Sequence, residues 1–212
     1  MRLAADVTLA VLRSTRLFPL WCGGALGVLV MVVPALSGAE LDFLDATLVL
    51  HLAMVTLLVG AAFTMDDPAR PLAEVLPISV KATTAIRMGL VGLVVSGFWA
   101  VILWLAPYTV DSGVPYPRAG LVVEAYATLA WVWTIAVLVA TRRGAGGVVA
   151  ASFPLVLAAV MAMLPDSVAL FVAPGAPTYP ASRLRWAALL LTGLVALWCA
   201  LAGLPRRRLV SR

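Results

Sequence analysis

Two ionisable side chains fall inside long apolar stretches of this sequence, and they are its first candidates for chemistry. His51 is the only histidine and lies midway along the second apolar run. Glu124 lies about one turn inside the start of the fourth run. Ionisable groups at such depth are rare in membrane helices and mark substrate or proton pathways by default. We therefore take His51 and Glu124 as possible translocation-path residues.

Each of these two residues also has structural interpretations. A neutral histidine can hydrogen-bond to a neighbouring helix, line a substrate path or transfer a proton, and the sequence leaves all three open. Glu124 can form an ion pair or extend its carboxylate to water. Its possible partners near the same end are Arg118, Arg183 and Arg185. Because the two residues sit at different positions along their runs, we expect them at different depths. No metal site is expected, because a metal needs several ligands.

A polar interruption over residues 64–81 separates the second apolar run from the third, and its residues are typical of a short capped helix. Asp67 is a good N-cap, and the proline after it is tolerated in a first helical turn. Glu74 lies one turn beyond Arg70 and can pair with it. Pro77 ends the helix, because the residue before a proline avoids helical geometry. An ordinary connection between two spans is the alternative.

Neither nucleotide nor thiol chemistry is indicated by the rest of the sequence. The phosphate-binding motif Gly-x-x-x-x-Gly-Lys-[Ser/Thr] does not occur, and the single lysine, Lys81, does not fit it. If the chain takes part in ATP-driven work, ATP and Mg²⁺ are therefore expected in a partner chain. Cys22 and Cys199 fall inside apolar runs and are interpreted as small buried apolar side chains.

The elements that must position these residues are membrane helices. Of the 212 residues, 63% are hydrophobic and 12% are charged, about half the charged fraction of soluble domains. Six apolar runs approach the roughly 20 residues that a helix needs to cross about 30 Å of hydrocarbon. Backbone polar groups cannot stay unpaired in lipid, so each run should be helical. The sequence therefore predicts one all-α membrane domain over residues 1–212. Its six spans are expected at approximately 17–36, 44–63, 86–106, 121–140, 148–164 and 186–204.

The distribution of basic residues predicts the orientation. With six spans, twelve of the 15 Lys and Arg residues fall on the side of the two termini and of the 64–81 loop. Basic residues collect on the cytoplasmic side of membrane proteins. We therefore expect a multi-pass protein of the cell inner (plasma) membrane with both termini and this loop in the cytoplasm. The net charge of +5 is interpreted as topology, so no nucleic-acid partner is expected.

Two further segments are expected at the membrane surface. Residues 1–16 form a plausible amphipathic interfacial helix, with four charged residues on one face. A basic leader is the alternative there. Residues 165–185 contain an apolar stretch too short to span, stopped by Pro174-Gly175. This pattern favours an outer re-entrant or interfacial segment, and a proline-rich outer loop is the alternative.

The segment Leu72-Ala-Glu-Val-Leu-Pro-Ile-Ser79 resembles a loop found in permeases of the type-2 ATP-binding-cassette exporter class. In that family the loop between the second and third spans carries an acidic residue, a short helix and a Pro-[Val/Ile/Leu]-Ser ending. The expected arrangement of the whole chain is also similar: an amphipathic N-terminal helix, six spans, interior termini and a broken outer segment before the last span.

The resemblance implies that residues 66–79 act as a coupling helix that docks into a cytoplasmic ATPase. The partners it implies are cytoplasmic ATP-binding subunits, which hold ATP and Mg²⁺, and a second permease copy or a related permease. The chain itself would carry no catalytic residue, cofactor or metal. It would line the path of an exported hydrophobic or amphipathic substrate. The coupling residues would be Asp66, Asp67, Arg70, Leu72, Glu74, Leu76 and Pro77.

Three other functions stay open. An integral membrane enzyme acting on lipids should show clustered Asp, His or Arg near one interface. A small secondary carrier should depend on protons or sodium through His51 or Glu124. An accessory scaffold would transport nothing.

Overall fold

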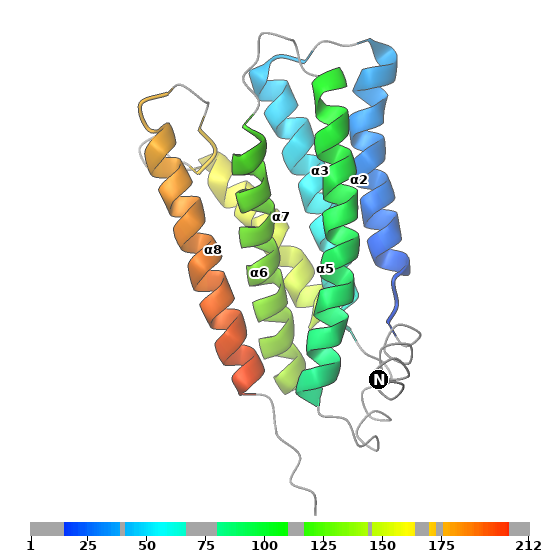
Figure 1. Cartoon of the computed structure of the whole chain (residues 1–212), viewed down its shortest axis with the longest axis vertical. Coiled ribbons are helices and arrows are strands. Elements are labelled where there is room, and N and C mark those ends of the chain that lie inside the picture. The colour runs from blue at the N-terminus through cyan, green and yellow to red at the C-terminus, as the bar shows by residue number, and fades with distance from the viewer. Residues whose placement is uncertain are drawn as a thin grey trace, which may run out of the picture.

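The computed structural model describes residues 15–38, 41–66, 80–109, 117–143, 146–163, 170–172 and 176–203. Within these ranges the chain is helical and contains no strand (Figure 1). Nearly all of the predicted interfacial helix and residues 67–79 of the predicted coupling loop lie outside the described residues. The α-helices are α2 (Phe18–Ser37), α3 (Phe43–Phe63), α5 (Val80–Leu105), α6 (Arg118–Arg143), α7 (Gly147–Met163) and α8 (Tyr179–Ala202); a 3₁₀ turn, η1 (Ala106–Tyr108), follows α5.

Five of these helices are long and apolar enough to cross a membrane: α2, α3, α5, α6 and α8. The expectation of an all-helical, multi-pass membrane protein is therefore confirmed, whereas the count of six spans is met only in part. The helix at the fifth predicted span, α7, has 17 residues and an interior proline, Pro154. At 1.5 Å per residue it is about 25 Å long, shorter than the roughly 30 Å of a hydrocarbon layer.

Two helices begin earlier than the apolar runs predicted. Helix α5 starts by residue 80 instead of 86, and α8 starts at Tyr179 instead of residue 186. Residues 179–185, expected in an outer re-entrant or interfacial segment, are therefore the first two turns of the last helix. The predicted spans left out Lys81 of α5 and Arg185 of α8, but a charge does not end a helix if its side chain finds a partner or faces the protein. Arg87 is only 7% exposed, so it faces the bundle.

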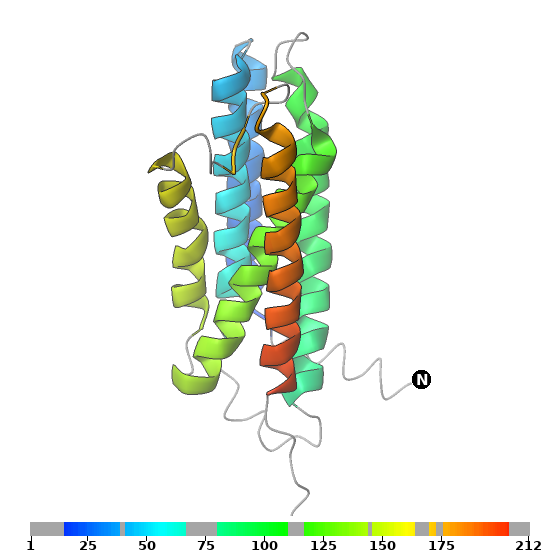
Figure 2. The ribbon, with the colours of Figure 1, turned by 90° about the vertical axis from the view of Figure 1, so that its left-hand side faces the viewer.

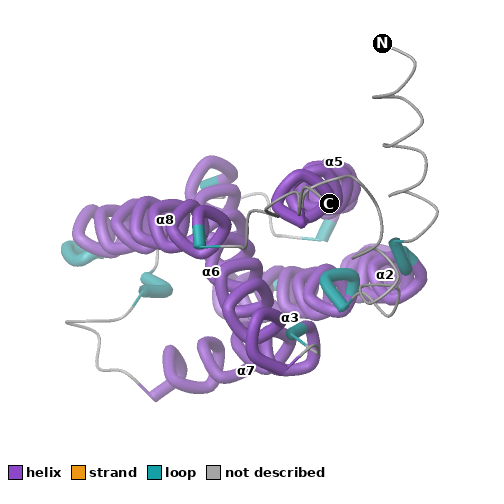
Figure 3. The backbone as a smooth tube through the Cα atoms, turned by 90° about the horizontal axis from the view of Figure 1, so that it is seen from below, coloured by secondary structure: helices purple, strands orange, loops and turns teal. Residues whose placement is uncertain are grey.

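Successive helices run in alternating directions, which places the starts of α3, α6 and α8 at one end of the bundle (Figure 1). Seen along the bundle, α3 and α6 occupy the centre, with α2, α5 and α8 around them (Figure 3). The apolar windows of α3 and α6 are each 56% buried, whereas that of α8 is 17% buried. Helix α7 packs against α3 and α6 at the margin of the bundle (Figure 2).

The peripheral helices turn most of their apolar side chains outward. Large exposed side chains include Trp21 on α2, Leu93 on α5 and Trp198 on α8. Such an exposed apolar surface suits lipid. Cys22 and Cys199 are exposed on the same helices, so the expectation that they are buried is wrong. An apolar run on a peripheral helix supplies the lipid-facing surface as well as the core, and the run alone does not separate the two.

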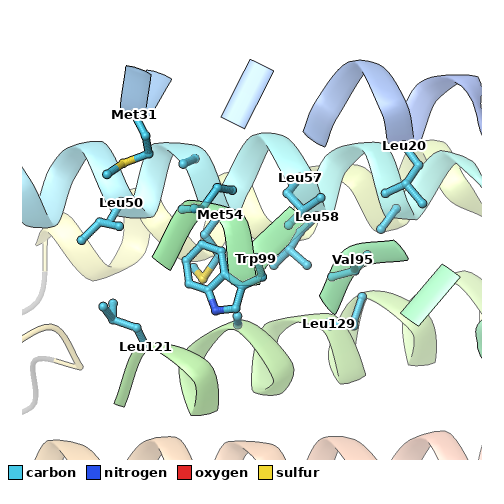
Figure 4. Packing of buried hydrophobic residues seen from close by; sticks show 14 of the residues in the cluster. Leu20, Met31, Leu50, Met54, Leu57, Leu58, Val95, Trp99, Leu121 and Leu129 are labelled. Atoms are coloured by element: carbon cyan, nitrogen blue, oxygen red, sulfur yellow. The ribbon is translucent and has the colours of Figure 1, made fainter. Parts of the chain in front are cut away.

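A buried apolar cluster fills the centre of the bundle. Figure 4 shows Trp99 of α5 beside Met54 of α3, between α3 and α6. Leu57 and Leu58 of α3 and Leu129 of α6 belong to the same cluster. All five side chains are nearly inaccessible to solvent. This core fixes α3 against α6 and so determines which of their polar side chains can meet.

Helices α2 and α3 cross at unusually close range. A Cβ atom on Gly23 would lie 2.4 Å from the carbonyl oxygen of Thr56, and one on Gly60 would lie 2.6 Å from the carbonyl oxygen of Pro19. Glycine is therefore required at both positions by the neighbouring backbone. A Cβ atom on Gly27, one turn further along α2, would lie 2.9 Å from the carbonyl oxygen of Ala53. Small residues spaced by four permit such approach between helices in lipid.

Candidate functional site

The structure brings three ionisable side chains together at one end of the bundle. His51 is the ninth residue of α3, Glu124 the seventh of α6 and Arg183 the fifth of α8. The three helices start at the same end, so these positions lie about 12, 9 and 6 Å along them. We call His51, Glu124 and Arg183 the polar chain. The expectation that His51 and Glu124 lie at different depths is wrong, because an offset of about 3 Å is bridged by their side chains.

Glu124 is the centre of the polar chain and uses both carboxylate oxygens. Its Oε2 atom lies 2.9 Å from His51 Nε2, and its Oε1 atom lies 2.6 Å from Arg183 Nη2. The Glu124 side chain is 3% exposed, against 14% for His51 and 24% for Arg183. The ion pair expected for Glu124 is therefore present, and Arg183 is its partner.

The His51 ring is held on three sides. Its Nδ1 atom lies 2.6 Å from the carbonyl oxygen of Thr47, one turn earlier in α3. Its Nε2 atom faces Glu124. The ring of Phe171 packs edge to face against it, with 4.0 Å between centroids. Phe171 belongs to the short segment 170–172, which lies between α7 and α8 in sequence. These contacts leave the imidazole a single orientation.

The segment 170–172 is itself tied to α8. Ser182 Oγ and Trp186 Nε1 both donate hydrogen bonds to the carbonyl oxygen of Leu170. Both donor side chains are buried. The aromatic side chains of Phe171 and Trp186 also pack against each other, with centroids 5.5 Å apart. The predicted outer segment therefore includes a stretch that covers the polar chain, and this stretch is not helical.

Arg183 is positioned by what surrounds its guanidinium group. The Tyr179 ring, one turn earlier in α8, lies 4.9 Å from Arg183 Cζ. Gly120 of α6 also borders the guanidinium group. A Cβ atom there would fall 2.2 Å from Nη1. The sequence indicated an arginine for Glu124 but could not select among three, because the choice depends on how α8 packs on α6.

The polar chain is suited to holding helices together and to holding a proton, but not to nucleophilic chemistry in this arrangement. The charges of Arg183 and Glu124 offset each other in a low-dielectric environment, where breaking a pair is costly. No group of three or more His, Cys, Asp or Glu side chains within the described ranges could hold a metal ion.

A second polar contact lies at the opposite end of the bundle. Asp66 Oδ1 accepts a hydrogen bond of 2.6 Å from the backbone N–H of Gly147, the first residue of α7. A Cβ atom on Gly147 would lie 2.7 Å from Asp66 Oδ2, so only glycine fits beneath the carboxylate. Asp66 thus caps α7 from the end of α3. The other predicted coupling residues, Asp67, Arg70, Leu72, Glu74, Leu76 and Pro77, lie outside the described residues.

Comparison with known proteins identifies no relative. No family model, curated protein or solved structure matches this chain. Function must therefore be argued from the residues and contacts described above.

Proposed function

We propose that this chain is the membrane-spanning subunit of an ATP-driven exporter. Two copies, or one copy with a related permease, would enclose the path of a hydrophobic or amphipathic substrate. Cytoplasmic ATP-binding subunits would dock on residues 66–79 and supply the energy. The proposal joins the resemblance of residues 72–79 to the arrangement of the helices around that segment.

The contact between Asp66 and Gly147 is the observation that carries the proposal. Asp66 lies three residues after the end of α3, and the segment 67–79 leads from it into α5. The carboxylate of Asp66 caps α7. A displacement of the docked segment would therefore act on three helices, α3, α5 and α7. Helix α3 is central and carries His51, so the displacement would also reach the polar chain. This is the linkage that a coupling segment requires.

Co-purification tests the proposal most directly. The tagged chain would be purified in mild detergent from cells expressing it at its natural level, and the preparation assayed for a bound ATPase. We expect an ATP-binding subunit at about one copy for each permease chain. Purification of an intact, folded chain without any ATPase would refute the proposal.

Charge reversal within the segment tests where the ATPase docks. Glu74→Arg should lower substrate-stimulated ATP hydrolysis and reduce the amount of bound ATPase, while insertion into the membrane is unchanged. Asp45→Arg is the matched control, because Asp45 is exposed near the start of α3, at the other end of the bundle. If both variants behave like the wild type, the ATPase does not dock through Glu74.

The polar chain favours one alternative, a small secondary carrier. Chains of Glu, His and Arg within a bundle are typical of proton-coupled transporters. Reconstitution in liposomes distinguishes the two functions: an exporter needs ATP and its partner, whereas a carrier moves substrate with a proton or sodium gradient alone. His51→Ala would abolish transport by the carrier. Retention of gradient-driven transport in that variant would exclude His51 as its coupling residue.

The same clustering meets one requirement of the lipid-acting enzyme, since His51, Glu124 and Arg183 gather near one end of the bundle. A general base nevertheless needs a free lone pair within reach of its substrate. In this arrangement both carboxylate oxygens of Glu124 are engaged and its side chain is almost fully buried. We therefore do not favour a lipid-acting enzyme.

A further inference from the structure

We propose that His51 and Glu124 together bind one proton, which links α3 to α6 inside the bundle. The inference begins with the Nδ1 atom of His51, 2.6 Å from the carbonyl oxygen of Thr47. A carbonyl oxygen can only accept a hydrogen bond, so Nδ1 must carry a hydrogen. A neutral imidazole has one ring hydrogen, and this contact uses it.

The Nε2 atom then has no hydrogen left if the ring is neutral. It nevertheless lies 2.9 Å from Oε2 of Glu124. An ionised carboxylate only accepts, and a bare ring nitrogen only accepts, so the two atoms would repel each other. A proton between them removes the conflict in either of two ways. The ring is an imidazolium that donates to the carboxylate, or Glu124 is a carboxylic acid that donates to Nε2. Both forms hold one proton more than a neutral ring with an ionised Glu124.

Arg183 decides where on Glu124 this proton is bound. Its guanidinium group occupies Oε1 at 2.6 Å and is a donor only, so Oε1 is not free to carry the proton. The proton is therefore confined to the line between Oε2 and Nε2. The other charged residues near this end of the three helices are Asp42 and Asp45 at the start of α3, Arg118 at the start of α6 and Arg185 on α8. Phe171 closes the remaining side of the ring with an apolar group.

Loss of the proton would act on one helix contact and spare another. Without it, Nε2 and Oε2 repel, and the hydrogen bond between α3 and α6 is lost. Glu124 would remain held by Arg183, so the link between α6 and α8 persists. The site is thus a proton-dependent link within the bundle. The inference is independent of the exporter proposal, because it follows from hydrogen-bond donors and acceptors alone.

The single histidine makes the test direct. The full chain would be labelled with ¹⁵N-histidine, placed in lipid nanodiscs and examined by NMR on either side of neutral pH, so that both ring nitrogens of His51 are observed without overlap. We expect Nδ1 to carry a hydrogen, and Nε2 either to carry a second hydrogen or to accept one from the carboxyl group of Glu124. Infrared difference spectra over the same range show whether a protonated carboxyl also disappears, which distinguishes the two bound forms.

Glu124→Gln supplies the matched comparison. The amide of glutamine can donate to a bare Nε2, so the neutral Nδ1–H ring is satisfied without an extra proton. In this variant the ring should therefore be neutral, and Nε2 should give the signal of a ring nitrogen that accepts a hydrogen bond. Asp45→Asn removes an exposed carboxylate from the same helix as His51 and should leave both ring-nitrogen signals as they are in the wild type.

A neutral ring with its hydrogen on Nε2 would overturn the proposal, because no additional proton is then needed at Glu124. A neutral ring beside an ionised Glu124 throughout the pH range would also overturn it. Both results come from the wild-type protein, so the test does not depend on the folding of the variant.

Discussion

Replacing Gly23 by alanine should destabilise this protein by driving α2 and α3 apart. The added Cβ atom would lie 2.4 Å from the carbonyl oxygen of Thr56 and 3.1 Å from the Cα atom of Gly60. Ordinary contact begins near 3.4 Å, so the helices must separate by about 1 Å. Both obstacles are backbone atoms, which cannot rotate away. Overpacking of this kind costs about 1–3 kcal/mol.

Gly97→Ala is the matched control, because it makes the same chemical change on α5. No atom lies within 4 Å of a Cβ built there. Alanine is favoured over glycine in helices by up to about 1 kcal/mol, so this variant should be neutral or slightly more stable. The free energy of unfolding would be measured in mixed micelles with increasing SDS, followed by circular dichroism. If Gly23→Ala is as stable as Gly97→Ala, the close crossing of α2 and α3 does not exist.

The double variant Gly23→Ala/Gly60→Ala sharpens the test. A Cβ atom on Gly60 would lie 2.6 Å from the carbonyl oxygen of Pro19, at the same crossing. A single separation of the helices relieves both clashes. The double variant should therefore lose less stability than the sum of the losses of the two single variants. Strict additivity would show that the two glycines act at independent places.

The remaining predictions use the same unfolding measurement. Asp66→Ala removes the cap on α7 and should lower the free energy of unfolding by about 0.5–2 kcal/mol. Asp66→Asn keeps an acceptor oxygen and should lower it by less. Equal losses would show that Asp66 does not stabilise the protein through this cap. Glu124→Ala leaves the partly exposed Arg183 without its carboxylate partner and should cost about 3 kcal/mol, most of which Glu124→Leu/Arg183→Met should recover; no recovery would refute the ion-pair explanation. Gly120→Ala displaces the guanidinium group and should cost about 1 kcal/mol, but nothing further in the Glu124→Ala background.

The helices themselves could be predicted from composition and length, because lipid leaves a spanning backbone no other way to pair its polar groups. Their ends could not. Helix α8 includes Arg183 and Arg185, and α5 includes Lys81, although the predicted spans began after these residues. Whether a charge ends a helix depends on whether its side chain finds a partner, and that partner lies on another helix.

The sequence singled out two residues of the polar chain, His51 and Glu124, but not the contact between them. His51 and Glu124 stood out because ionisable groups in apolar runs are costly. Their contact was missed because depth along a run was estimated from sequence position alone. Asp66 was assigned to coupling, and its cap on α7 could not be foreseen, since Gly147 lies 81 residues away.

The sequence by itself determined that this chain is a bundle of membrane helices, because each apolar run must pair its own backbone polar groups in lipid and can do so only as a helix. It also determined that His51 and Glu124 need an explanation. Only the tertiary structure decided that the two meet, that Arg183 completes the polar chain, and that Nδ1 of His51 lies against the carbonyl oxygen of Thr47. Those outcomes depend on how three helices pack, and packing in lipid is set by close contacts between side chains distant in sequence.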